Sequence, residues 1–241
     1  MMENKISISD SMRSAFFLWK KYFVKIIAVG FIVYLPAQIC IELAEIQLDK
    51  VFINEAESIQ VKNRVYDMIR YIIGAVAMIG IINFIVKILD NEEEQTIGEI
   101  ILHGLRRWPK FMEVGLYAGF KIFVRILLLI IPGIHKAIQL SFVDCVVSTK
   151  YNVFTDACGK SEDLVKNYWW KVFGFLLLVF VFGFLFEFLL SLPLLLHPEL
   201  FKYNILIIAI AVIISVLETY FIVVKAVYYF NLKQLKSEKK T

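Results

Sequence analysis

Six long apolar blocks are the feature that most limits what this chain can fold into. They cover residues 22–44, 67–89, 112–131, 134–148, 171–192 and 204–230. A membrane-spanning helix needs about 20 mainly apolar residues, and the fourth block is the short one. The pair Pro132-Gly133 is expected to end the third helix and reverse the chain in a tight turn. The blocks predict an all-α polytopic membrane protein with about six transmembrane helices.

Composition excludes an ordinary water-soluble domain. Hydrophobic residues make up 59% of the 241 residues, and the mean hydropathy is +0.71. Soluble domains are about 45–50% apolar, so a soluble fold of this composition would expose large apolar patches. The formal net charge of +4 is modest, and the basic residues flank the apolar blocks. That pattern indicates orientation in a membrane, and we expect no nucleic-acid partner.

Lysine and arginine predict the orientation of the chain. They gather in the N-terminal segment, in residues 106–110, in residues 150–171 and in the C-terminal tail. With six spans, all four segments lie on the same side of the membrane. Because cytoplasmic loops carry the excess of lysine and arginine, both termini are expected in the cytoplasm.

Three amphipathic segments precede the first, third and fifth blocks. Helix-capping signals open them: Ser7 with Asp10, Thr96 with Glu99, and Thr155. Each ends in tryptophan and basic residues, which favour the headgroup layer. We interpret them as interfacial helices, the alternative being soluble loop helices. Their predicted anchors are Trp19, Trp108, Trp169 and Trp170.

The repeated pattern predicts a single integral membrane domain over residues 1–241. Its three units, each an interfacial helix followed by a helical hairpin, would be roughly residues 1–90, 91–150 and 151–241. Gly74 and Gly80, and likewise Gly115 and Gly119, are predicted helix-packing positions because small residues let helices approach closely.

Three stretches carry a family resemblance: "ISISDSMRSAFFLWKKYFVKII" with "YLP", "IPGIHKAIQLSFVDCVV", and "TDACGKSEDLVKNYWWKVFGFLLL". Together they resemble the membrane domain attached to some bacterial glycerophosphodiester phosphodiesterases and related bacterial six-span membrane proteins. The resemblance implies a six-span helical fold in the cell membrane, with no known catalytic residues in the membrane part. Asp144-Cys145 departs from the small or proline residues of that family. The phosphodiesterase reaction needs a soluble barrel that a chain this short and apolar does not contain, so no enzyme is expected.

Charged residues inside the apolar blocks are the only internal indication of activity. Counted from the outer ends at 1.5 Å per residue, Lys121 and Asp144 lie at about 16 and 15 Å. By the same count Arg125 and Glu187 lie at about 10 and 9 Å. These depths predict two ion pairs, Lys121 with Asp144 and Arg125 with Glu187. The full candidate polar layer is Lys121, Arg125, Ser141, Asp144, Glu187 and Glu218.

The layer has two interpretations. Paired charges can fix helix register, and losing one partner of a buried pair typically costs about 3–5 kcal/mol. Charges within a membrane are also often functional, binding a headgroup, an ion or a proton in transit. The first interpretation is favoured because the signs nearly balance and the depths match.

These observations lead to a non-enzymatic membrane scaffold, lipid-associated factor or accessory subunit as the main functional hypothesis. The alternative is a small transporter or permease component that uses the charged layer. An intramembrane enzyme is the least favoured, because Ser141, Asp144 and Ser148 alone supply no nucleophile with its base. The expected partners are membrane lipids and either another protein or a second copy of the chain. No cofactor or metal is expected.

Overall fold

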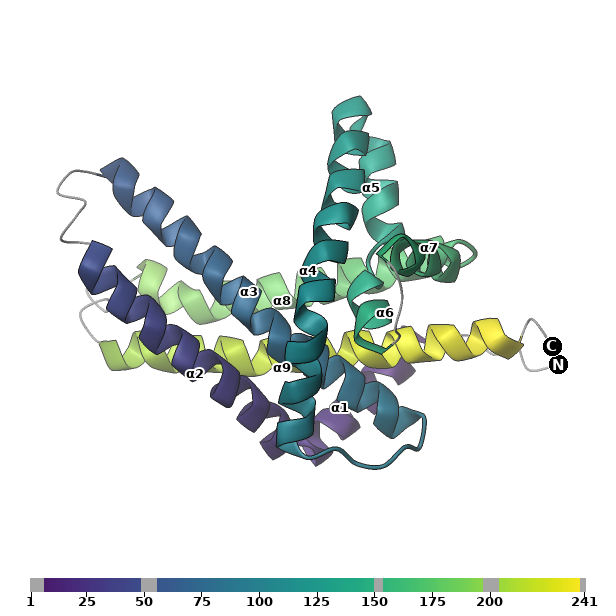
Figure 1. Cartoon of the computed structure of the whole chain (residues 1–241), viewed down its shortest axis with the longest axis horizontal. Coiled ribbons are helices and arrows are strands. Elements are labelled where there is room, and N and C mark those ends of the chain that lie inside the picture. The colour runs from purple at the N-terminus through teal and green to yellow at the C-terminus, as the bar shows by residue number, and fades with distance from the viewer. Residues whose placement is uncertain (1–6, 49–55, 150–153, 197–203, 239–241) are drawn as a thin grey trace.

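Helices account for nearly all of the described structure (Figure 1). The computed structural model describes residues 7–48, 56–149, 154–196 and 204–238. Within these ranges there is no strand, so the all-α class is confirmed. The helices are α1 (Ile8–Lys21), α2 (Phe23–Leu48), α3 (Ala56–Leu89), α4 (Ile97–Leu128), α5 (Ile130–Gln139), α6 (Val143–Thr149), α7 (Phe154–Val165), α8 (Trp169–Leu196) and α9 (Asn204–Glu238).

Four described segments are long and apolar enough to cross a membrane. They are Met68–Leu89, Ile130–Thr149, Trp169–Pro193 and Ala209–Glu238, with a shorter apolar stretch at Phe23–Tyr34. The chain is therefore an all-α polytopic membrane protein. The predicted third span is not among the four, and Glu113, Lys121 and Arg125 interrupt its apolar sequence.

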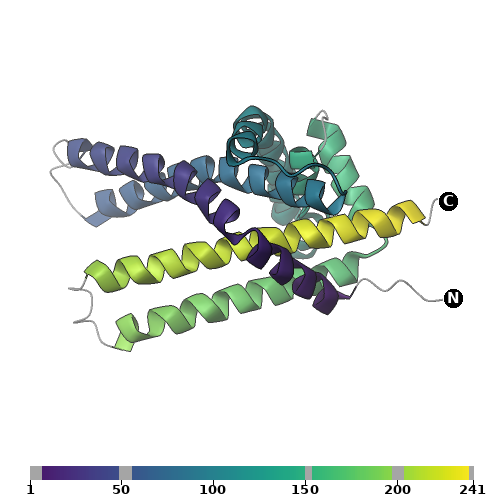
Figure 2. The same cartoon turned by 90° about the horizontal axis from the view of Figure 1, so that it is seen from below.

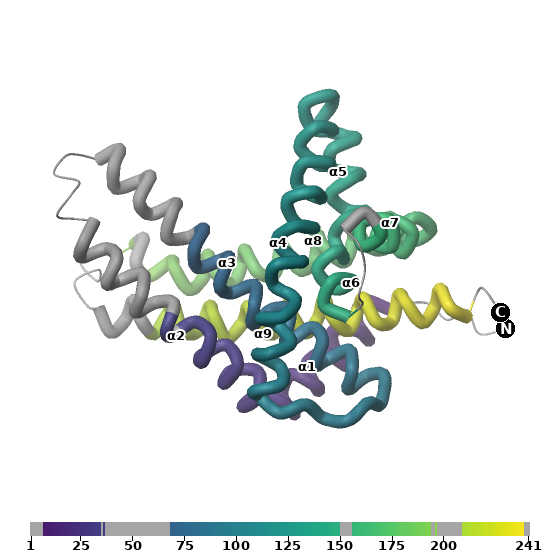
Figure 3. Tube along the Cα trace, in the orientation of Figure 1, coloured from purple at the N-terminus to yellow at the C-terminus, as the bar shows by residue number. Residues whose placement is uncertain are grey.

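The helices run in two main directions. Helices α8 and α9 lie side by side along the length of the molecule (Figures 1 and 2), and α3 runs obliquely to them in Figure 1. The hairpin of α4 and α5 runs across them: it stands upright in Figure 1, and α4 is seen nearly end-on in Figure 2. The tube in Figure 3 shows the same change of direction between α3 and α4.

The break between α4 and α5 is at Leu129, whose backbone is extended with φ −163° and ψ 142°. The prediction that Pro132-Gly133 ends the helix is therefore wrong. Pro132 lies in the first turn of α5, where proline is tolerated because the first N–H groups of a helix have no partner within it. A Cβ on Gly133 would lie 3.0 Å from Cα of Ile126, so the missing side chain lets α5 approach α4.

The predicted fourth span is not one continuous helix. Helix α5 ends at Gln139, and a turn over residues 140–142 separates it from α6. Helix α6 lies in the core with α3, α4, α7 and α9, and Cys145 and Phe142 are fully buried. Distances counted along residues 134–148 as a single helix therefore fail at this turn.

The first half of α4 packs along α3 through two glycines. A Cβ on Gly80 would lie 2.5 Å from the carbonyl oxygen of Ile100, and one on Gly104 would collide with the carbonyl of Val76. Both positions agree with close helix packing, and Gly74 likewise lies against Tyr34. Gly115 and Gly119 face open space, so their predicted packing role is wrong.

Helix α1 packs on α9, so the first and last helices of the chain are in contact. The indole N–H of Trp19 donates to Oγ1 of Thr219 at 3.0 Å, and the Asn231 amide donates to Oγ of Ser11 at 3.0 Å. The predicted units 1–90 and 151–241 are therefore in direct contact. Both α1 and the last turns of α9 lie at the same end of the molecule (Figure 2).

Two of the predicted helix caps are present. Oγ of Ser7 accepts the Asp10 N–H, and Thr96 and Glu99 form a reciprocal capping box. The two hydrogen bonds from Thr96, the backbone one first, hold the pKa of Glu99 below its ordinary value. Helix α7 begins at Phe154, so Thr155 lies inside the helix rather than before it.

Candidate functional site

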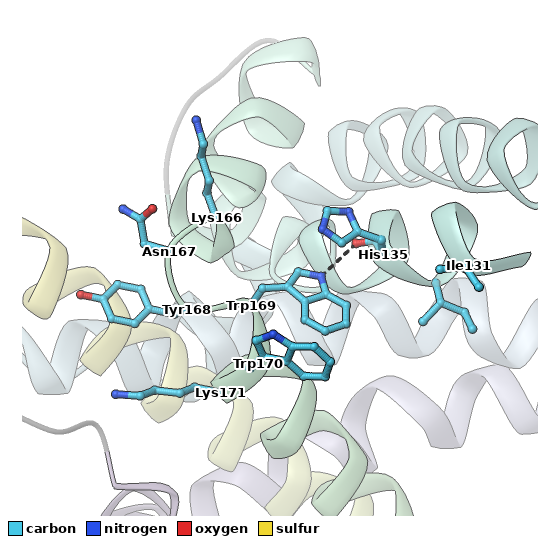
Figure 4. Close-up of a pocket in the computed structure, with 9 residues that line it drawn as sticks. Ile131, His135, Lys166, Asn167, Tyr168, Trp169, Trp170 and Lys171 are labelled. Atoms are coloured by element: carbon cyan, nitrogen blue, oxygen red, sulfur yellow. Dashed lines mark hydrogen bonds between the residues drawn. The ribbon is translucent and has the colours of Figure 1, made fainter.

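A pocket of about 680 Å³ lies between α5 and the turn that joins α7 to α8 (Figure 4). Its lining combines aromatic, apolar and basic side chains: Ile131, Ile134, His135, Lys166, Asn167, Tyr168, Trp169, Trp170 and Lys171. The turn exists because α7 ends at Val165 and the chain continues through Tyr168, whose N–H donates to the Val165 carbonyl at 2.8 Å. Helix α8 then starts at Trp169.

Stacked rings form one wall of this pocket. Trp169 lies between His135 and Phe173, with ring centroids 5.3 and 5.5 Å away and interplanar angles of 15° and 9°. Trp170 meets Trp169 edge-on at 4.7 Å. The indole N–H of Trp169 donates to the His135 carbonyl at 3.4 Å, which ties α8 to α5. The wall is therefore built mainly of aromatic rings.

The basic residues stand at the rim. Lys166 and Lys171 extend away from the tryptophan pair and do not converge on one point (Figure 4). The Lys171 ammonium lies 5.9 Å from the centre of the Tyr168 ring. An enclosed anion site would bring its cations together on one ligand. Diverging lysines beside the exposed ring of Trp170 instead suit a surface that carries many phosphates, such as a layer of lipid headgroups.

The four predicted tryptophan anchors differ in their surroundings. Trp108 donates its indole N–H to the Ile72 carbonyl of α3 at 2.6 Å, so it is held by protein, as Trp19 and Trp169 also are. Trp170 has 76% of its surface exposed. Sequence reasoning treated the four alike because it could not see which indole groups find partners inside the chain.

The predicted pair of Lys121 with Asp144 does not form. Asp144 of α6 accepts a hydrogen bond from Lys225 of α9 at 2.5 Å, and its side chain is 12% exposed. The depth count placed Asp144 incorrectly because it assumed a straight fourth span parallel to the others.

Lys121 belongs to a second cluster, which joins α4, α5 and α7. Glu162 of α7 forms an ion pair with Lys136 at 2.5 Å and a longer one with Lys121 at 3.7 Å. The Lys136 side chain is only 5% exposed, whereas Lys121 is 32% exposed and lies 4.6 Å from the ring centre of Tyr117. Two cations therefore share one carboxylate where the hairpin meets α7.

The other members of the predicted layer are not brought together. Arg125 and Glu187 are exposed and make no ion pair with any residue that the structure describes. Glu187 lies near Glu218 of α9, a carboxylate of the same sign. Ser141 lies in the turn between α5 and α6, and its Oγ is buried without a hydrogen-bond partner. The six residues thus do not form one layer.

Sequence reasoning missed Glu162 and Lys136 as partners. One signal was available: Lys136 lies within the apolar residues 134–148, and a cation there needs a partner. Lys225 carried a similar signal, because a single cation between long apolar stretches of α9 requires a partner or water.

His103 provides a further contact between α4 and α6. Its ring N–H donates to the Ser148 carbonyl at 2.8 Å, so Nε2 carries the proton. Burial lowers the pKa of His103 below 6.5, the bond to Ser148 opposes this, and the nearby Arg107 lowers it further.

No family model, curated protein or solved structure matches this chain. Among the residues that the structure describes, no group of three histidine, cysteine, aspartate or glutamate side chains is placed to hold a metal ion.

Proposed function

We propose that this chain is a non-enzymatic, multi-pass protein of a bacterial-type cell membrane that acts on the lipid layer as a scaffold or lipid-associated factor. Both termini would lie in the cytoplasm. The proposal includes the likeness to the membrane domain of bacterial glycerophosphodiester phosphodiesterases, for which the sequence motifs are the support.

One observation carries the proposal: the aromatic and basic pocket at the start of α8. Trp170 is 76% exposed beside the diverging Lys166 and Lys171, at the point where the chain enters its most apolar helix. Tryptophan and lysine at such an entry favour the headgroup layer, and each cation near an anionic surface contributes about 1 kcal/mol. Anionic lipid is therefore the expected ligand of this rim.

The test compares the full-length protein in nanodiscs with and without phosphatidylglycerol. The melting temperature is expected to be higher with the anionic lipid, and Lys166→Gln/Lys171→Gln is expected to lose most of that increase. Arg13→Gln/Lys20→Gln removes the same charge from exposed positions on α1, another predicted interfacial helix, and shows whether the loss is specific to the pocket. Equal lipid dependence of all three proteins would overturn the proposed role of the pocket.

The alternative is a small transporter, and one observation favours it. Glu187 and Glu218 lie near each other on α8 and α9, and neither pairs with a cation in the described part of the chain. A transport pathway predicts that water reaches them. In a chain without its native cysteines, Glu187→Cys should then react with a water-soluble maleimide, whereas an acyl-facing position should not.

A further inference from the structure

The α4–α5 hairpin has an amphipathic outer part that no other helix of the described residues covers. On α4, Leu116, Phe120, Phe123 and Leu127 share one face and are 57–77% exposed. Lys121 and Arg125, four residues apart, share another face. The tip continues the apolar surface, with residues 128–131 between 68% and 80% exposed. Apolar and cationic side chains are thus separated around the helix.

The cationic face is turned toward the end of the molecule where α9 finishes. Lys121 and Lys136 pair with Glu162 of α7. The next residue, Asp163, pairs with Lys236 in the last turns of α9. Helix α7 therefore lies between the hairpin and the C-terminal end of α9, which carries the basic tail. The lysines of the hairpin point to the side on which the proposed topology places the cytoplasm.

The hairpin contacts the start of α8 midway along α5. His135 of α5 stacks on Trp169, the first residue of α8. Trp169 also begins a 25-residue apolar segment long enough to cross a membrane. At this contact the hairpin runs across the direction of α8 and α9 (Figures 1 and 2). A hairpin that meets a spanning helix at the membrane surface and runs across it lies along the membrane.

We infer that the α4–α5 hairpin lies in the plane of the membrane within the cytoplasmic leaflet, as an apolar wedge between lipid acyl chains. The face with Leu116, Phe120, Phe123 and Leu127 contacts the acyl chains. The opposite face, with Lys121 and Arg125, is turned toward the headgroups. This is the arrangement of an interfacial amphipathic helix, which buries its apolar face about 5–10 Å into the leaflet. The hairpin then does not cross the membrane, although Ile130–Thr149 is long and apolar enough to do so. The crossing helices are the other three candidate segments, in α3, α8 and α9, together with α2. An even count of four keeps both termini on one side.

The inference deepens the proposed function, because it names the surface by which the protein would act on one leaflet. It does not depend on anionic headgroups. The depth measurements below can therefore contradict it without contradicting the proposed role of Lys166 and Lys171, and the reverse also holds. A wedge in one leaflet expands that leaflet alone, which is a physical means for a scaffold to shape a membrane.

Depth along the hairpin is the deciding measurement. In a chain whose native cysteines are replaced by alanine, Leu116→Cys, Phe123→Cys and Ile130→Cys are each labelled with a fluorophore in lipid vesicles. Quenching by lipids brominated at different acyl positions reports the depth of each label. An in-plane hairpin predicts closely similar depths. A transmembrane helix predicts depths spread over roughly 21 Å between positions 116 and 130, and such a spread would overturn the inference.

Accessibility from outside gives a second measurement. Leu129→Cys, at the tip, is expected to resist a membrane-impermeant maleimide added to intact cells. Leu196→Cys, at the far end of α8, is expected to react and is the matched control. A tip that reacts from outside as readily as Leu196→Cys would mean that the hairpin crosses the membrane.

Discussion

Gly104 of α4 lies against the backbone carbonyl of Val76 in α3. Four residues earlier on α4 and four residues later on α3, the carbonyl of Ile100 lies against Gly80. The two contacts are reciprocal, since each helix supplies one glycine and one backbone carbonyl. They allow the backbones of α3 and α4 to lie close together, and this contact sets the direction in which the hairpin leaves α3.

Gly104→Ala is therefore expected to destabilise the protein by about 1–3 kcal/mol, because a carbonyl oxygen cannot move aside as a flexible side chain can. Thermal unfolding in detergent measures the effect. Gly119→Ala is the matched control on the same helix, since a Cβ there meets nothing within 4 Å. A melting temperature for Gly104→Ala equal to that of Gly119→Ala would contradict the packing described.

Asp144→Leu and Lys225→Leu are each expected to cost about 3 kcal/mol, since each leaves the partner's charge with poor compensation. The double variant should recover much of the loss. Unfolding of the four proteins gives the coupling energy. The cycle of Lys121→Leu with Asp144→Leu should be additive, because Lys121 pairs with Glu162 instead. Strong coupling between Lys121 and Asp144 would restore the pairing that depth counting predicts.

Stability is expected to fall as the pH drops below 6.5, in part through His103. Because its pKa is lowered in the folded protein, the unfolded chain binds the proton first. The contribution of His103 is thus constant above pH 6.5 and is lost progressively below it. Unfolding measured over this range for the parent and for His103→Gln isolates the effect. The variant should show the weaker pH dependence, and identical slopes would exclude His103 as a source.

Trp170 is expected to be quenched most strongly among the four tryptophans by shallowly placed quenchers in lipid vesicles. Chains that retain one tryptophan each, with phenylalanine at the other three positions, allow the comparison. Trp108 should be protected because its indole is held against Ile72. Stronger quenching of Trp108 than of Trp170 would contradict the different surroundings of these two residues.

Composition and periodicity predicted the helices well, because an apolar block long enough to span a membrane has no other stable form there. The caps at Ser7 and Thr96 were also predictable, since they depend only on neighbouring residues. The break at Leu129 could not be predicted in this way. Its extended backbone separates α4 from α5, yet leucine carries no turn signal, and the proline nearby lies inside the next helix.

The candidate site was predicted less completely. Trp169, Trp170 and the lysines around them were predicted to lie at a membrane surface from their types alone, and the structure places them together in one pocket. The ion pairs were not, because counting 1.5 Å per residue gives depth only when every helix runs along the membrane normal. Because α4 and α5 run across the bundle, Lys121 pairs with Glu162 of α7, and Asp144 pairs with Lys225 of α9.

The contact between Trp19 and Thr219 joins residues 200 positions apart. During synthesis at about 5–20 residues per second, the first helix waits roughly 10–40 s for its partner. Until α9 emerges, α1, whose Ser11 and Ala15 are buried in the finished protein, lacks the helix on which it mainly packs. A truncated chain that lacks α9 therefore carries an unshielded surface at its very start, which quality-control proteases could recognise.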